Sequence, residues 1–131
     1  MATVKRFEDL EIWQIARDIC KDIHLLTNKT EFSRDFGLRR QIRSSSGSAM
    51  DNIAEGFERD GKKEFIQFLS IAKGSSGETR SQIYRALDQE YISKEEFEQE
   101  YSKMILLSVK INNTIAYLKK SEFKGNKYRE Q

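Results

Sequence analysis

Proline is absent from all 131 residues of the chain. Because proline lacks a backbone N–H and clashes with the preceding turn, it breaks most helices in whose interior it falls. A chain of this length without proline is free to form long, uninterrupted helices. Four segments have the corresponding pattern, with apolar residues recurring at spacings of three and four, the mark of one helical face.

These segments cover about residues 9–28, 34–59, 62–89 and 94–120. The stretch from Ser44 to Ser48 resembles a flexible linker, but the apolar phase continues across it from Ile42 to Ile53, so we predict an unbroken second helix. Ser93, followed three residues later by Glu96, predicts a capping box that begins the fourth helix.

Four amphipathic helices joined by short loops predict an all-α fold, an antiparallel up-and-down four-helix bundle. The bundle is expected to occupy residues 1–121, and residues 122–131 to form a flexible basic tail. Small residues lie in the middle of the second and third helices. We expect the two helices to pack closely there, at Ser45, Ala49, Gly74 and Ser76.

Composition and the N-terminal sequence favour a cytoplasmic protein. No apolar stretch follows the first basic residues, and no run approaches the roughly 18 apolar residues of a membrane span. The single cysteine, Cys20, excludes an intramolecular disulfide and fits a reducing compartment. A net charge of +2 specifies no partner.

Two motifs resemble catalytic sequences without completing them. The run from Gly56 to Lys63 has the spacing of a phosphate-binding loop, but Lys63 stands where a serine or threonine must ligate magnesium. Ser70 and Lys73 match the S-x-x-K motif of penicillin-recognising enzymes, whose companion motifs are missing. Chance is the better explanation of both.

Metal chemistry is also poorly supported. Cys20 and His24 stand four residues apart, but a zinc site takes three or four protein ligands and His24 is the only histidine. Glu55 and Glu58 form a carboxylate pair without the histidines of a di-iron bundle. We therefore expect no cofactor, no small-molecule substrate and no enzymatic activity.

The strongest basic cluster is Arg39, Arg40 and Arg43 in the second helix, to which Lys119 and Lys120 add charge near the tail. One interpretation is a surface that contacts the phosphates of a nucleic acid. The other is a solvated helix face with internal ion pairs. The sequence leaves both open.

Two features predict an oligomer. The first and fourth helices carry more apolar surface than one bundle core requires, and surplus apolar surface often marks an interface. Asn52 and Glu55 are polar groups in an otherwise apolar helix, beside Gly56. We expect them to form hydrogen bonds across helices or subunits, because leaving such groups buried and unpaired costs about 1–3 kcal/mol each.

Several stretches together resemble one family. Phe7–Trp13 reads FEDLEIW, Gly37–Arg43 reads GLRRQIR, Asn52–Gly56 reads NIAEG, and the third helix carries a run of Phe65, Phe68, Leu69, Ala72 and Gly74. Over roughly residues 7 to 118 the chain resembles the four-helix-bundle proteins encoded in 23S ribosomal RNA intervening sequences. These proteins are related to the accessory proteins of diversity-generating retroelements.

The resemblance implies an antiparallel bundle that assembles as a homopentameric ring. In the retroelement branch it implies contact with RNA and with reverse transcriptase, a nucleic-acid enzyme. Two functions follow for this chain. The first is an adaptor associated with RNA or a ribonucleoprotein, acting through Arg39, Arg40, Arg43 and the lysines. The second is a purely structural or protein-binding oligomer that does not contact nucleic acid.

Overall fold

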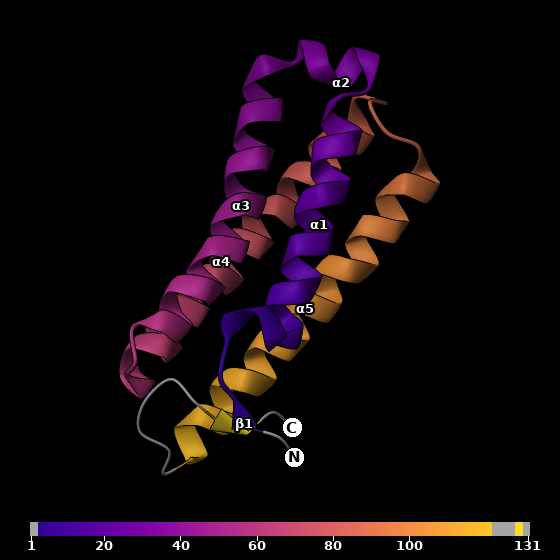
Figure 1. Cartoon of the computed structure of the whole chain (residues 1–131). Helices are drawn as coiled ribbons and strands as arrows, with labels where there is room; N and C mark the ends of the chain where they lie inside the picture. Colours follow the sequence, from indigo (N-terminus) through magenta and orange to yellow (C-terminus); the bar gives the residue numbers. More distant parts are fainter. Residues whose placement is uncertain (1–2, 122–127, 130–131) are drawn as a thin grey trace.

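A computed structural model describes residues 3–121 and 128–129 of the chain. Helices make up nearly all of the described part (Figure 1). In chain order the elements are β1 (Thr3–Val4), the 3₁₀ helix η1 (Phe7–Asp9), α1 (Glu11–Thr27), α2 (Thr30–Arg34), α3 (Phe36–Glu58), α4 (Lys62–Asp88), α5 (Lys94–Lys120) and β2 (Tyr128–Arg129).

The four long helices form the predicted up-and-down bundle. Helix α1 packs against α3 and α5, and α4 packs against the same two helices, with the most extensive contact between α3 and α4. Figure 1 shows the α1–α3 connection and the start of α5 at one end of the bundle, and the α3–α4 turn with the end of α5 at the other. The all-helical architecture is thereby confirmed.

Part of the segment expected to be a flexible tail is paired with the N-terminal segment. Strand β2 runs antiparallel to β1, with Val4 opposite Tyr128 and Thr3 opposite Arg129. Residues 122–127 and 130–131, which make up the rest of that segment, lie outside the described residues. The pairing holds the two strands beside each other at the lower end of the bundle in Figure 1.

Helix α3 is unbroken from Phe36 to Glu58, so the prediction that the serine-rich stretch is helical is confirmed. The capping box is also confirmed. The Ser93 hydroxyl accepts from the Glu96 N–H, and the Glu96 carboxylate accepts from the Ser93 N–H. The sequence did not predict α2, because five residues are too few to show an apolar period.

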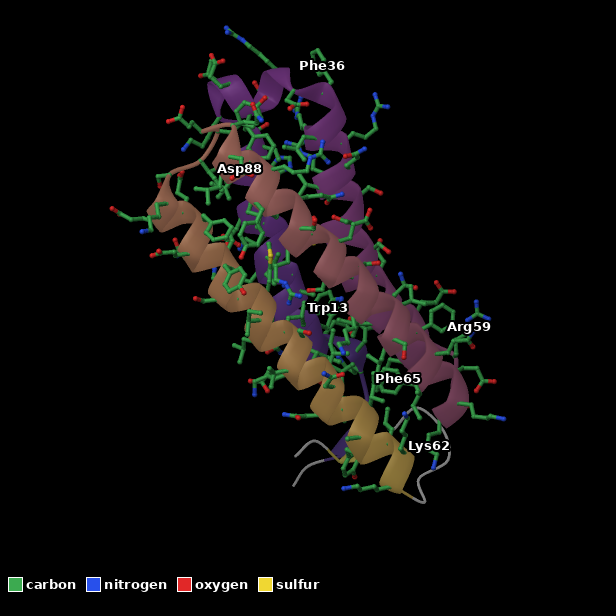
Figure 2. All side chains as sticks on the ribbon, turned by 180° about the vertical axis from the view of Figure 1, so that it is seen from behind. Trp13, Phe36, Arg59, Lys62, Phe65 and Asp88 are labelled. Carbon is green, nitrogen blue, oxygen red and sulfur yellow. The ribbon has the colours of Figure 1, made fainter. Side chains whose placement is uncertain are left out.

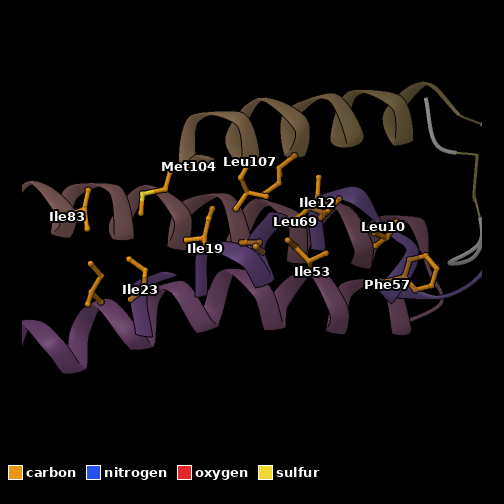
Figure 3. Close-up of a cluster of buried hydrophobic side chains, with 14 of the residues drawn as sticks. Leu10, Ile12, Ile19, Ile23, Ile53, Phe57, Leu69, Ile83, Met104 and Leu107 are labelled. Carbon is orange, nitrogen blue, oxygen red and sulfur yellow. The ribbon is translucent and has the colours of Figure 1, made fainter. Parts of the chain in front are cut away.

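The core runs the length of the bundle and is almost wholly aliphatic and aromatic (Figure 3). Each long helix contributes the residues of its apolar face. The bulkiest side chains are fully buried, and this loss of apolar surface to water is the main stabilisation of the fold. They are Leu10, Ile23, Phe32, Leu38, Ile42, Ile53, Phe57, Phe65, Leu69, Ile83, Met104 and Leu107.

Serines join α3 to α4 through a small polar network inside this core. The Ser45 Oγ lies 2.7 Å from the Thr79 Oγ1 and donates to the Gln82 Oε1 at 2.6 Å. One turn further along, the Ser48 and Ser75 hydroxyls are 3.0 Å apart. Ala49 and Ser76 are buried in the same part of the core. The small residues of α3 and α4 therefore face each other, as their positions suggested.

Gly74 was assigned wrongly to the close packing of the two helices. A Cβ added at Gly74, Gly47 or Gly77 would meet nothing within 4 Å, and Gly74 is exposed. Gly74 thus faces solvent in the single chain, because the α4 face that packs on α3 passes through Ser75 and Thr79 instead. The close approach lies at Gly56 of α3, where an added Cβ would be 2.6 Å from the Phe68 Cβ of α4.

Replacing Ser45 with alanine should destabilise the protein by about 1–2 kcal/mol, because Gln82 and Thr79 would remain buried with one hydrogen bond fewer each. Urea denaturation followed by circular dichroism measures the change. Ser44→Ala, at an exposed neighbouring position, is the matched control. Equal stability of the two variants would show that the network contributes nothing.

Candidate nucleic-acid interface

The basic cluster predicted in the second helix lies at one end of the bundle. Arg39, Arg40 and Arg43 project from the first two turns of α3, beside the end of α1, and we call them the arginine corner. They share this position because residues three and four apart lie on one side of a helix. Asp35 begins α3 by accepting from the Leu38 N–H at 3.1 Å.

Arg43 joins α3 to the end of α1. Its Nε donates to the Thr27 hydroxyl at 2.8 Å, and its Nη2 donates to the Asn28 side-chain oxygen at 3.0 Å. A cation at the C-terminal end of a helix is favoured by the helix dipole, so this contact stabilises the α1–α3 packing. Partial burial, followed by the positive charge of Arg39, lowers the pKa of the Arg43 guanidinium.

The side chains of Arg39 and Arg40 make fewer hydrogen bonds than that of Arg43. The Arg39 Nη2 reaches the same Asn28 oxygen at 3.5 Å, and its Nε is buried without a hydrogen-bond partner among the described residues. Arg40 is exposed, and its side chain makes no hydrogen bond or ion pair within the described part of the chain. None of the three arginines meets a carboxylate among the described residues, so the expected internal ion pairs are absent there. The other part of that interpretation, a solvated helix face, agrees with the exposure of Arg40.

The surrounding segment is also basic. Residues 28–43 contain five basic and two acidic residues, a net charge of +3 against +2 for the whole chain. Both acids have partners at this end, since Glu31 pairs with Arg34 at 3.3 Å and Asp35 accepts from the Tyr91 hydroxyl at 2.9 Å. Basic residues therefore outnumber acidic ones along this segment of the chain.

The structure does not bring Lys119 and Lys120 to this surface. They lie in the last turn of α5, whose end is adjacent to the start of α4, where the Lys62 ammonium donates to the Ser121 carbonyl oxygen at 2.5 Å. This is the opposite end of the bundle (Figure 1). Glu58 stands 19 positions after Arg39 in α3, which corresponds to about 28 Å along the helix. The two basic groups cannot form one compact site on a single chain.

An open groove of about 730 Å³ lies between the α1–α2 and α4–α5 connections. Its charged lining consists of two lysines and two glutamates, and Lys29 is held by Glu96 of α5 at 2.6 Å. Because these charges balance, the groove offers no selective attraction for an anion.

Asn52 and Glu55 do not join helices of the chain. The Asn52 side-chain amide donates to the Ser48 carbonyl oxygen at 2.8 Å, and Glu55 is exposed and pairs with Arg59 at 2.6 Å. Both contacts lie along α3, so the expected hydrogen bonds to another helix are absent from the described part of the chain. A role between subunits stays a prediction. Gly56 is the member of this motif that meets another helix.

The residues weighed for catalysis or metal binding are ordinary parts of the bundle. The Cys20 thiol donates to the Ser46 carbonyl oxygen at 3.1 Å, and burial raises its pKa, while His24 is exposed. Ser70 is exposed on α4, and the run from Gly56 to Lys63 spans the end of α3, the connecting turn and the start of α4. Residues 3–121 and 128–129 hold no group of three His, Cys, Asp or Glu side chains suited to a metal ion.

Two notable residues were not found from the sequence. Phe36, the first residue of α3, is 68% exposed beside the arginine corner (Figure 2). Glu100 of α5 is buried, with one carboxyl oxygen unpartnered among the described residues. The signal for Glu100 is its place in the core series Phe97, Met104 and Leu107, which it continues at spacings of three and four. No such signal exists for Phe36, since apolar spacing does not indicate whether the first residue of a helix is exposed.

The fold and this surface define a small helical-bundle protein with a basic corner at one end. No helix in the described part of the chain has both the length and the apolar character needed to cross a membrane. The chain belongs to the family of 23S rRNA-intervening sequence proteins, whose sequence model matches residues 8–113. This match confirms the family resemblance seen in the sequence motifs.

A similar solved structure is a protein with unknown function from the S23 ribosomal protein family of Bacteroides thetaiotaomicron. The two chains are 21% identical, with a TM-score of 0.73, and the match covers 79% of this chain and 97% of the other. At this identity the likeness establishes the fold alone. No curated protein matches the chain.

Proposed function

We propose that this protein is a non-enzymatic, cytoplasmic adaptor that binds RNA through the arginine corner. The observation that carries the proposal is the absence of a carboxylate partner for Arg39, Arg40 and Arg43 in the described structure. Guanidinium groups bind phosphate oxygens through paired N–H donors. The family name supports RNA as the source of that phosphate.

We further propose that the protein acts as a homopentameric ring. Large apolar side chains that face solvent on the single chain support assembly, among them Ile71 of α4 and Leu106 and Val109 of α5. A ring would repeat the arginine corner five times, and repeated sites on one RNA increase the overall affinity. Light scattering should give a mass of about five times 15.4 kDa. A mass of one chain would contradict assembly.

The double variant Arg39→Gln/Arg40→Gln tests RNA binding. Arg43 is left intact, because it holds α1 to α3. We expect weaker binding to a structured RNA and a shallower dependence of log Kobs on log salt concentration. Two lost phosphate contacts reduce that slope by about 1.4–1.8. Filter binding over a series of salt concentrations measures both quantities.

Lys119→Gln/Lys120→Gln is the matched control, since it removes two exposed charges from the opposite end. Full binding by this variant, with the loss confined to the arginine variant, supports the arginine corner. Equal losses would indicate only general attraction to a cationic protein. No binding by the unaltered protein would favour the second function, a structural or protein-binding oligomer.

A further inference from the structure

An exposed aromatic ring stands next to the arginine corner. Phe36 leaves 68% of its surface in water, although a phenylalanine side chain normally gains by burial. Figure 2 shows Phe36 at the end of the bundle, away from the core. It precedes Arg39 by three residues and Arg40 by four, so the ring and both guanidinium groups share one side of α3.

The space beside the ring is open. Most of the Phe36 side chain is exposed, and the next residue, Gly37, is exposed and carries no side chain. No side chain from position 37 therefore covers the ring. A planar ligand can approach it while contacting the neighbouring arginines.

The backbone that carries the ring is held in place by buried contacts. Phe32, which is fully buried, stacks on Tyr91 with ring centroids 5.3 Å apart. The Tyr91 hydroxyl donates to Asp35, and Asp35 caps α3. These contacts fix the α2–α3 corner to the α4–α5 connection. Phe36 is thus presented by a rigid support, which limits the entropy lost when a ligand stacks on it.

We propose that Phe36 stacks against an unpaired RNA base while Arg39 and Arg40 contact the flanking phosphates. This inference rests on the proposed function and adds its substrate class, which is a single-stranded or looped RNA. Bases in a paired A-form helix keep their faces stacked, whereas unpaired bases are free to stack on aromatic side chains. An aromatic ring on the same side of the helix as two guanidinium groups therefore favours loops over duplexes.

The test compares an RNA hairpin having an unpaired loop with the fully paired duplex of its stem. Phe36→Leu keeps an apolar side chain but removes the π-face, and Phe36→Trp keeps a stacking surface. We expect Phe36→Leu to weaken hairpin binding about 5- to 150-fold, as for the loss of one stacked base. Duplex binding should stay unchanged. The salt slope should also stay unchanged, since no charge is removed, and Phe36→Trp should retain the affinity for the hairpin.

Equal hairpin affinity of Phe36→Leu and the unaltered protein would overturn the inference, as would equal losses on hairpin and duplex. A changed mass by light scattering would instead assign Phe36 to a contact between copies of the chain, which also overturns it. These results differ from failure of the proposed function. In that case the unaltered protein binds neither RNA, or its binding does not depend on Arg39 and Arg40.

Discussion

Replacing Gly56 with alanine is expected to destabilise the protein by about 3 kcal/mol, the upper end of the usual cost of overpacking a core. The new Cβ would lie 2.6 Å from the Phe68 Cβ and 3.2 Å from the Phe65 Cδ1. A Cβ is fixed to its own backbone, so no rotamer change of Phe68 relieves the clash. Helix α4 must move away from α3, which also disturbs the packing of Phe65 on Phe57.

Gly47→Ala and Gly74→Ala are the controls, because an added methyl group at either position meets nothing within 4 Å. Alanine has a higher helix propensity than glycine, so each control should stabilise the protein, by up to about 1 kcal/mol. Urea denaturation should show that Gly56→Ala lowers the free energy of unfolding, whereas the same replacement at Gly47 or Gly74 raises it. A Gly56→Ala protein as stable as its controls would contradict the close approach of α3 and α4 at this point.

The second large effect is expected at Glu100, as a fall in stability with rising pH. The side chain is only 3% exposed, and one of its carboxyl oxygens has no partner in the described structure. Burial, then a hydrogen bond with Asp22 and its negative charge, raise the pKa of Glu100 to about 8. Lys103 lies close by but is held by Asp18 at 2.7 Å and Asp22 at 2.6 Å. Glu100 is therefore protonated at neutral pH.

The direction of the pH effect follows from this raised pKa. In the unfolded chain Glu100 loses its proton near its ordinary pKa of 4.5, whereas the folded protein keeps it to about pH 8. The stability that this proton contributes is complete below pH 4.5 and is lost as the pH rises through 8. Within that window the loss is at most about 1.4 kcal/mol per pH unit. Asp18 and Asp22 raise the pKa of Lys103 above 10.5. The stability that the Lys103 charge contributes is therefore lost only at higher pH.

Glu100→Gln should remove most of this dependence, since an amide does not ionise and its NH₂ group can donate to Asp22. We expect the variant to match the unaltered protein near pH 5 and to exceed it by roughly 2 kcal/mol or more above pH 8. Urea denaturation over this pH range provides the measurement. Glu98→Gln changes an exposed carboxylate on the same helix and should leave the dependence in place. A flat pH profile in the unaltered protein would contradict the assignment.

Apolar periodicity was sufficient to predict the four long helices. It decided the serine-rich stretch correctly, because the spacing from Ile42 through Ala49 to Ile53 depends only on helix geometry. The local signals at Ser93 and Glu96 also sufficed, since capping involves residues three positions apart. Such features need no knowledge of how the helices pack.

Contacts between helices were harder to predict. Gly56 and Gly74 both lie inside long helices, and only the relative rotation of α3 and α4 decides which of them meets a neighbouring helix. Glu100 was not recognised as a core residue, although its spacing from Phe97 and Met104 places it there. The charge of Glu100 indicated an exposed position and its spacing indicated a buried one, and the packing of the helices buries it.

The candidate site was predicted in part. The arginines of α3 were found from their spacing, but the lysines of α5 were grouped with them because both are basic, and they lie at the opposite end. The proximity of Phe36 follows from its position four residues before Arg40. Its exposure does not, since that depends on Phe32 rather than Phe36 filling the space beside Tyr91.

The position of the paired strands β1 and β2 determines where a linker, a dye or a fused domain is best joined to the protein. Both strands lie at the end of the bundle away from the arginine corner. A surface linker, a dye or a fused domain joined next to either strand would leave Arg39, Arg40 and Phe36 pointing outward. Immobilisation through this end therefore presents the proposed RNA site to solution, whereas attachment near α2 would obstruct it.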